Sequence, residues 1–279
     1  MLNVLAVNYF SSDVAKQYIE SFQSQTYKDW NLYIVDNSEN VSELNKLRAI
    51  SDDARVKIID AKKNQGFFGA AQYGFSKNIC EVASNDLVIV SNLDLYFDNE
   101  NTLQELVNIT ENYDDVGVFA PDIYSIKRNS HQNPMLKNRP SEKAMKLRTY
   151  MHANTYASQF STLVDLYSSA LREKLGNKRD IKLKEQDIYA AHGSFMIFTS
   201  EFFARGGNFN YEVFLYGEEL YVAEQCKKLG LRIILIPSVV VHHITNYTFG
   251  TWQSKKILRY KVQAAKHGYE MLYGSKKLN

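Results

Sequence analysis

The alternation of apolar, strand-like runs with helix-length segments is the feature that most constrains the fold of this chain. Helix patterns separate the runs; Ala15, Tyr18, Ile19 and Phe22, for example, fall on one helical face. The apolar runs read LNVLAV, NLYIVD, VKIID, DLVIVSN and VGVFAP. Strands separated by helices indicate βαβ units. We therefore expect an α/β fold with a mostly parallel central sheet flanked by helices.

The pattern changes between residues 122 and about 190, where helix formers and tyrosines dominate and no convincing strand is visible. This helical insertion could be a binding element, a dimer contact or a lid, because periodicity does not choose among them. After it, GSFMIFTS, RIILIP and VVVHH predict three further strands, and residues 217–229 predict a helix. We expect one catalytic domain over residues 1–245 and a helical tail over 246–279.

Composition excludes several classes of protein. The 279 residues are 45% hydrophobic and 23% charged, which is ordinary for a folded chain and unlike a disordered one. Cys80 and Cys226 form no CxxC pair, which argues against a disulfide framework or structural zinc and fits a reducing compartment. The N-terminus reads as a first strand and not as a signal peptide, and no apolar run is long enough to span a bilayer. We expect a cytoplasmic protein.

The tail is strongly basic and amphipathic. From residue 252 onward, seven Lys or Arg residues stand against Glu270 alone. An apolar stripe recurs there at helical spacing: Leu258, Val262, Ala265, Tyr269 and Leu272. Such a helix could lie on the anionic inner face of a membrane, or its stripe could pack on the body or on a second subunit as a homodimer.

Polar residues stand at the carboxyl ends of three predicted strands: Asn8, Asp36 and Asp94. Ligands of open α/β sheets bind at that edge, so the repetition predicts a pocket, although Asp also commonly caps turns. Asn92 precedes Asp94 by two positions and can face the same ligand in an extended segment. Hard oxygen ligands of this kind suit Mg²⁺ or Mn²⁺ bound mainly through substrate phosphates.

The segment from Asn64 to Gly69, NQGFFG, follows the third strand and opens a helix. Glycine there permits close approach of a ligand, and a helix N-terminus attracts phosphate, although a tight turn explains Gly66 equally well. The segment matches neither GxGxxG nor GxxxxGK[ST]. The dinucleotide fingerprint and the P-loop are therefore excluded.

Glu218 and Glu219 begin the helix predicted at residues 217–229. Carboxylates are favoured at a helix start by its dipole, and one of them could also act as a general base. His243 ends an apolar strand, where it is either packed or a metal ligand. The remaining histidines show no ligand spacing and are interpreted as structural: His131, His152, His192 and His267.

Taken in order, these motifs resemble family 2 glycosyltransferases with the GT-A fold, in particular bacterial rhamnosyltransferase-like enzymes of surface polysaccharide synthesis. The matching pieces run from residue 1 to about 245: VNYFSSD, VDNSEN, NQGFFGAAQYGF, SNLDLYF, GSFMIFTSEFF, FLYGEELYVAEQCKKLGLRIILIP and VVVHH. The resemblance implies a metal-dependent, inverting hexosyltransferase that uses a dTDP- or UDP-sugar. It also implies a glycan or lipid-linked saccharide acceptor, as in O-antigen or capsule synthesis, with residues 122–190 on the acceptor side and no nucleic-acid partner.

The resemblance also assigns roles to individual residues. Asp94 and His243 would hold Mg²⁺ or Mn²⁺, and Glu219, or else Glu218, would be the catalytic base. The donor would be bound by Asn8, Tyr9, Asp36, Asn64, Gly66 and Asn92.

Two positions depart from the family pattern. Asn92 stands where the family's DxD metal motif commonly has its first Asp, and Glu219 stands where the family usually has Asp. One extra methylene moves the carboxylate, and such displacements can be costly for catalysis. A non-catalytic nucleotide-sugar-binding relative is therefore an alternative. A sugar-1-phosphate nucleotidyltransferase is a weaker one, since the chain lacks a Gly-rich, basic N-terminal loop.

Overall fold

The computed structural model describes residues 1–79, 81–174, 183–244 and 254–274. The first half of the chain contains β1 (Leu2–Asn8), α1 (Ser12–Gln23), β2 (Trp30–Asp36), α2 (Val41–Arg48), β3 (Val56–Asp60), α3 (Phe67–Asn78), β4 (Leu87–Asn92), β5 (Leu95–Tyr96), α4 (Thr102–Thr110) and β6 (Val116–Ser125). The second half contains β7 (Ser130–His131), α5 (Glu142–Met151), α6 (Thr155–Lys174), β8 (Gln186–Ile188), β9 (Phe195–Thr199), α7 (Ser200–Ala204), α8 (Glu218–Leu229), β10 (Arg232–His243) and α9 (Lys255–Tyr273).

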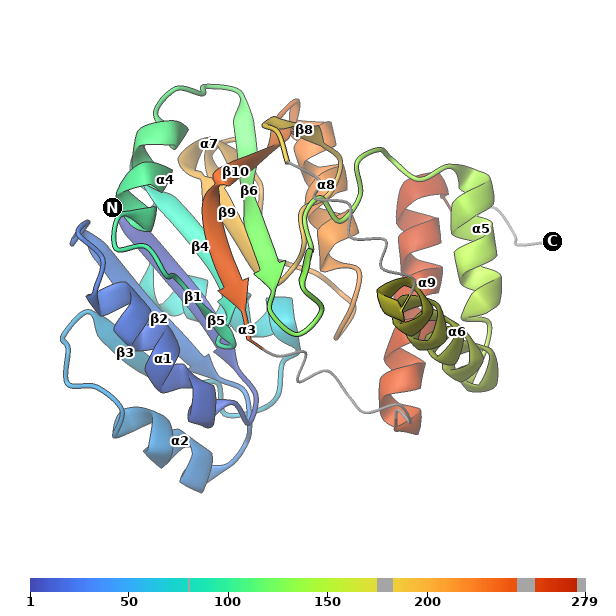
Figure 1. Ribbon diagram of the computed structural model, residues 1–279, viewed down its shortest axis with the longest axis horizontal. Helices are drawn as coiled ribbons and strands as arrows, with labels where there is room; N and C mark the ends of the chain where they lie inside the picture. The colour runs from blue at the N-terminus through green and yellow to red at the C-terminus, as the bar shows by residue number, and fades with distance from the viewer. Residues whose placement is uncertain (80, 175–182, 245–253, 275–279) are drawn as a thin grey trace.

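One sheet crosses the molecule in the order β3-β2-β1-β4-β9-β6-β10-β5 (Figure 1). Strands β3, β2, β1 and β4 are mutually parallel, as are β6 and β10, whereas β9 runs antiparallel between these two groups. The α/β fold with a mostly parallel sheet is thus confirmed. The register places Asn8 opposite Asp36 and Val7 opposite Asn92, so the carboxyl ends of β1, β2 and β4 share one edge.

Helices cover both faces of the sheet because alternate strand residues point to opposite sides. On one face Val4 and Ala6 of β1 pack with Tyr18 and Phe22 of α1. On the other face Leu5 belongs to the core that includes Phe68 of α3 and residues of α8. The apolar stripe predicted for residues 15–22 is therefore the face that α1 buries.

Two predictions about strands were wrong. RIILIP and VVVHH belong to one strand, β10, whose register against β6 shifts between Ile236 and Val240. This shift surrounds Pro237, which has no N–H to donate to the ladder. In the region where no strand was expected, β6 extends to Ser125, and β7 and β8 add pieces of two and three residues. Runs that short carry no readable periodicity.

The C-terminal helix α9 packs within the chain. It lies beside α5, α6 and α8, and α5, α6 and α9 form a lobe at one side of the α/β body (Figure 1). Leu258, Ala265, Tyr269 and Leu272 of the predicted stripe are buried. Of the alternatives for the stripe, the structure therefore shows packing on the body; residues 246–253 and 275–279 of the tail lie outside the described residues.

No helix in the described part of the chain is both long enough and apolar enough to cross a membrane.

Candidate active site

A cleft of about 610 Å³ lies at the carboxyl ends of β1 and β4. Its walls come from the β3–α3 loop, the β4–β5 turn, the start of α8, the end of β10 and the start of α9. Eight of the residues predicted for the site line it: Tyr9, Asn64, Gly66, Asn92, Asp94, Glu218, Glu219 and His243. Acidic side chains from separate stretches of sequence thus meet in one cleft.

Asn8 and Asp36 lie beneath the cleft and do not line it. They are 0% and 3% exposed, and Asn8 Nδ2 donates to Asp36 Oδ1 at 2.8 Å. Asp36 also accepts from the backbone N–H and the hydroxyl of Ser38, at 3.2 and 3.0 Å. Their polar atoms therefore hold the end of β2 in place, and it is Asn37, the next residue, that reaches the cleft.

Asn37 connects this strand end to the loop before α3. Its Nδ2 donates to Asn64 Oδ1 at 2.9 Å and to Gly66 O at 3.0 Å, and its Oδ1 accepts from Gln65 N at 2.8 Å. Gly66 has φ 75°, and a β-carbon there would lie 2.0 Å from the carbonyl oxygen of Phe214. Only glycine allows the two loops to touch, so Gly66 shapes the cleft through backbone packing.

Asp94 and His243 form the polar centre of the cleft. Asp94 Oδ2 lies 3.0 Å from His243 Nε2 although 149 residues separate them, because β5 pairs antiparallel with the end of β10. His243 Nδ1 lies 2.7 Å from Gln132 Oε1. Both ring nitrogens thus face oxygen acceptors, so a neutral ring that donates to Gln132 turns its lone pair toward the carboxylate. A proton or a cation between His243 Nε2 and Asp94 Oδ2 relieves the repulsion between the lone pair and the carboxylate.

Glu218 and Glu219 stand at the first turn of α8, after Gly217 in the left-handed conformation. Glu218 is 5% exposed and accepts from Tyr216 N at 3.1 Å. Burial, reinforced by the neighbouring Glu219, raises the pKa of Glu218 to about 8. Burial also raises the pKa of Glu219, which lines the cleft. A carboxylate with a raised pKa is a stronger proton acceptor near neutral pH than an ordinary one.

The sequence matches the model of Glycosyl transferase family 2 over residues 4–206. The chain belongs to this family. Its fold is similar to that of GalNAc-T7, solved with UDP, GalNAc and Mn²⁺, with a TM-score of 0.58 and 14% identity over 95% of this chain and 47% of that chain. It is also similar to S. aureus TarS, with a TM-score of 0.53 and 11% identity over 88% of this chain and 36% of that chain.

The chain thus has the GT-A fold of these two proteins and spans less than half the length of either solved chain. No curated protein matches the sequence. At 11–14% identity the structural likeness concerns the fold alone.

The residues of the cleft fit a divalent cation that is shared with a substrate. Asp94 and His243 offer one carboxylate and one imidazole at the same point. Among the described residues, no group of three or more His, Cys, Asp or Glu side chains gathers as a metal cage. Mg²⁺-type ions are commonly bound by one or two protein ligands and complete their coordination with waters and substrate phosphates. The pair therefore fits an ion that arrives with a phosphorylated donor.

His192, interpreted from sequence as structural, lines the cleft. Its ring centroid lies 6.4 Å from that of His243. Burial, and to a lesser extent the nearby His243, lowers the pKa of His192 to about 4, so its ring is neutral. Spacing along the sequence could not reveal it, because the residue reaches the cleft through the loop before β9.

The start of α9 supplies further cleft residues that the sequence did not indicate. Lys256, Ile257 and Tyr260 line the cleft. The ring of Tyr260 stacks on Phe214, with centroids 4.6 Å apart. Arg128, from the turn between β6 and β7, adds a second cation. The basic tail therefore contributes to the cleft of the transferase as well as to the helical lobe.

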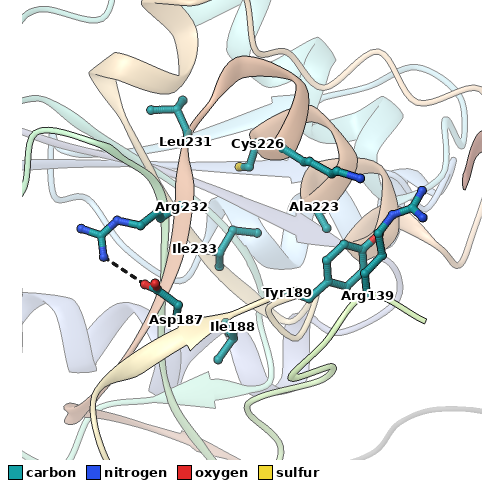
Figure 2. Close-up of a pocket in the computed structure, with 10 residues that line it drawn as sticks. Arg139, Asp187, Ile188, Tyr189, Ala223, Cys226, Leu231, Arg232 and Ile233 are labelled. Atoms are coloured by element: carbon teal, nitrogen blue, oxygen red, sulfur yellow. Dashed lines mark hydrogen bonds and ion pairs between the residues drawn. The ribbon is translucent and has the colours of Figure 1, made fainter. Parts of the chain in front are cut away.

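A second cavity of about 290 Å³ lies between β8, β10 and α8 and is lined by none of the residues predicted for the site (Figure 2). Two of its charged side chains are already paired there: Arg232 Nη1 lies 3.0 Å from Asp187 Oδ1 (Figure 2). Arg139 makes two hydrogen bonds to Glu224, at 2.7 and 2.9 Å. Because these groups satisfy one another, the cleft that contains Asp94 and Glu219 is the candidate active site.

Proposed function

We propose that this glycosyltransferase moves a sugar from a nucleoside-diphosphate donor to a hydroxyl group of a saccharide or lipid-linked saccharide acceptor, with inversion at the anomeric carbon. The observation that carries this proposal is that the Asp94–His243 pair and the carboxylate of Glu219 line the same cleft. The Asp94–His243 pair suits a diphosphate with its cation, and the Glu219 carboxylate suits an incoming alcohol.

The donor would lie along the edge formed by the β3–α3 loop and the β4–β5 turn. Tyr9, Asn64 and Asn92 present an aromatic ring and carboxamides to this part of the cleft. Lys256 and Arg128 are positive side chains within reach of the same space. Stacking, hydrogen bonding and positive charge together suit a base, a ribose and a diphosphate, of which a dTDP- or UDP-sugar is our candidate.

Asp94 and His243 would hold Mg²⁺ or Mn²⁺, which when bound supplies charge neutralisation for the departing diphosphate. Gln132 fixes the orientation of the His243 ring through Nδ1. This contact at Nδ1 leaves Nε2 as the nitrogen that is free to coordinate. Asn92, beside Asp94, contributes a neutral oxygen where the family commonly has a second carboxylate.

Glu219 would accept the proton of the acceptor hydroxyl. Its side chain lines the cleft, and the rise in its pKa through burial makes it a better base. Glu218 is the alternative, but its Oε1 is occupied by the backbone N–H of Tyr216. A base beside the acceptor, acting in a single displacement, gives inversion.

Our proposal for the acceptor is less specific than our proposal for the donor. The resemblance to rhamnosyltransferase-like enzymes favours a role in bacterial surface polysaccharide synthesis, such as O-antigen or capsule. Helix α9 joins the cleft to α5 and α6, within the segment expected on the acceptor side. We therefore place the acceptor between the start of α8 and the start of α9.

A donor screen tests the proposal. In the presence of Mn²⁺, one nucleoside-diphosphate sugar of a panel should raise the Tm selectively, because a ligand that binds only the folded state stabilises it. That donor should be hydrolysed or transferred, and Glu219→Gln should retain the Tm shift while kcat falls by roughly 10² or more. Binding without any turnover by the wild type would instead favour the non-catalytic relative, and a fully active Gln variant would move the base elsewhere.

A further inference from the structure

Helix α5 and the first half of α6, residues 155–164, expose most of their large apolar side chains. Tyr156 is 80% exposed and Phe160 is 69% exposed. Six of the eleven large apolar side chains that are exposed among the described residues belong to this pair of helices: Leu147, Tyr150, Met151, Tyr156, Phe160 and Val164. The other five lie elsewhere along the chain, so the six residues above define a local apolar face.

The first half of α6, residues 155–164, is oriented opposite to the usual arrangement in a globular protein. Tyr156, Phe160 and Val164 follow one another at intervals of four, so they form one stripe, and that stripe is exposed. The opposite side buries polar residues: Ser158, Gln159, Ser161 and Thr162. Thr162 accepts from Lys261 Nζ of α9 at 2.9 Å, and Ser158 contacts His152 Nδ1 at 2.9 Å. The inward side of α6 is thus held by hydrogen bonds, which leaves its apolar side free for a partner.

Positive charge predominates around the apolar face. Helix α5 carries Lys143, Lys146 and Arg148 against Glu142, whose Oε1 lies 3.3 Å from Lys146 Nζ. Beside them, α9 exposes Lys255 and Arg259. Tyr, Phe, Leu and Met side chains with Lys and Arg around them are typical of helices that lie in the headgroup region of an anionic bilayer. A second protein surface would need a complementary acidic, apolar patch.

Helix α9 connects the lobe that carries the apolar face with the candidate active site. Helix α9 begins at the cleft, where Ile257 and Tyr260 line it, and continues into the lobe beside α5 and α6 (Figure 1). Thr149 of α5 donates to the carbonyl oxygen of Ala265 at 3.4 Å. A surface that binds α5 and α6 is therefore connected to the cleft through one continuous helix.

We propose that the apolar face of α5 and α6 docks the protein onto the surface of an anionic lipid bilayer. This assigns membrane contact to residues 143–164, because the apolar stripe of α9 is used in packing within the chain. The docking stands whether or not the cleft transfers a sugar. If both proposals hold, it brings the cleft to the surface from which a lipid-linked acceptor would be reached.

Vesicle sedimentation of the full chain tests the proposal without an activity assay. The wild type should pellet with vesicles of phosphatidylcholine and phosphatidylglycerol and should stay in the supernatant with phosphatidylcholine alone. Tyr156→Ser combined with Phe160→Ser should lower partitioning about tenfold or more, since both apolar side chains would insert. The side chains are exposed, so the variant should keep the Tm of the wild type.

Matched controls separate the possible outcomes. Val41→Ser removes an apolar side chain that is 74% exposed on α2, and it should pellet as the wild type does. Lys143→Glu should weaken pelleting with the anionic vesicles. The proposal is overturned if the wild type does not pellet, or if the double variant pellets as well as the wild type. A wild-type dimer in sedimentation velocity that the double variant abolishes, without vesicle binding, would assign the face to a second copy.

Discussion

A β-carbon on Gly193 would lie 2.8 Å from Oε1 of Glu219. The Glu219 carboxylate, in the first turn of α8, thus lies directly against the backbone that leads into β9, with no room for a side chain between them. The backbone N–H of Gly193 is also one of the groups that interact favourably with the ionised form of Glu219. Gly193 therefore positions Glu219 toward the cleft.

Gly193→Ala should lower kcat without unfolding the protein. The added methyl must displace the Glu219 carboxylate, and a displacement near 1 Å can cost about 10²-fold in rate. Steady-state kinetics and donor titration should show this loss with little change in donor affinity. In the Glu219→Gln background the same change should cost much less, since the two substitutions remove one function. Independent, multiplicative losses would show that Gly193 acts through some other group.

Glu218 is expected to reduce the stability of the protein as the pH rises. Because burial raises its pKa from 4.5 to about 8, the folded state keeps a proton that the unfolded state loses between these values. The free energy of unfolding should therefore fall as the pH increases from about 5 to about 8. Glu218→Gln keeps an oxygen for the N–H of Tyr216 and removes this ionisation.

Thermal unfolding of the wild type and Glu218→Gln across pH 5 to 8 checks this expectation. The variant should exceed the wild type by an increasing margin, on the order of a few °C at pH 8. A constant difference between the two proteins at every pH would mean that Glu218 does not titrate in this range. Glu219→Gln, measured in parallel, should shift stability in the same direction because its pKa is also raised by burial.

The strand pattern predicted the sheet edge at which the site lies, because the carboxyl ends of parallel strands follow from the alternation of apolar runs. How deeply each polar residue lies depends on register, which the sequence does not state. Asn8 of β1 lies opposite Asp36 of the neighbouring strand β2, and the two side chains form a hydrogen bond beneath the cleft. Tyr156 and Phe160 show that spacing does not determine burial either. Apolar residues at helical spacing usually face the core, yet the structure exposes both side chains.

The contacts made by the second half of the chain were harder to predict. The family resemblance assigns Asp94 and His243 to the same metal site. In the structure Asp94 Oδ2 lies 3.0 Å from His243 Nε2. His192, Lys256 and Tyr260 were not assigned to the site, since each reaches the cleft through tertiary packing of a loop or of α9. Residue type and local spacing do not contain that information.

Asp94→Asn and His243→Ala should each abolish the effect of Mn²⁺ on donor binding. Either change removes one of the two ligands that the cleft offers, so the remaining one should hold the ion weakly. The Tm shift that the donor gives with Mn²⁺ should fall to the smaller shift that it gives with a chelator. His131→Ala is a matched control, because His131 pairs with Asp122 outside the cleft. Equal shifts with and without Mn²⁺ in the wild type would contradict the metal assignment.

Gly66→Ala should damage both the stability of the protein and its affinity for the donor. Gly66 has φ 75° and ψ −176°, a conformation essentially restricted to glycine. A β-carbon would also overlap the carbonyl oxygen of Phe214 at 2.0 Å, and that oxygen belongs to backbone that cannot rotate away. The strain alone is worth about 1–3 kcal/mol, so a Tm decrease of roughly 4 °C or more is expected.

Gly69→Ala is the matched control for Gly66→Ala. It adds the same methyl group to the first turn of α3, where the nearest heavy atom would be Cβ of Gln65 at 3.1 Å and no positive φ is involved. Its Tm should stay near that of the wild type, because alanine is favoured over glycine in a helix. If the two variants lost stability and donor affinity equally, the contact between Gly66 and Phe214 would not be what joins the two loops of the cleft.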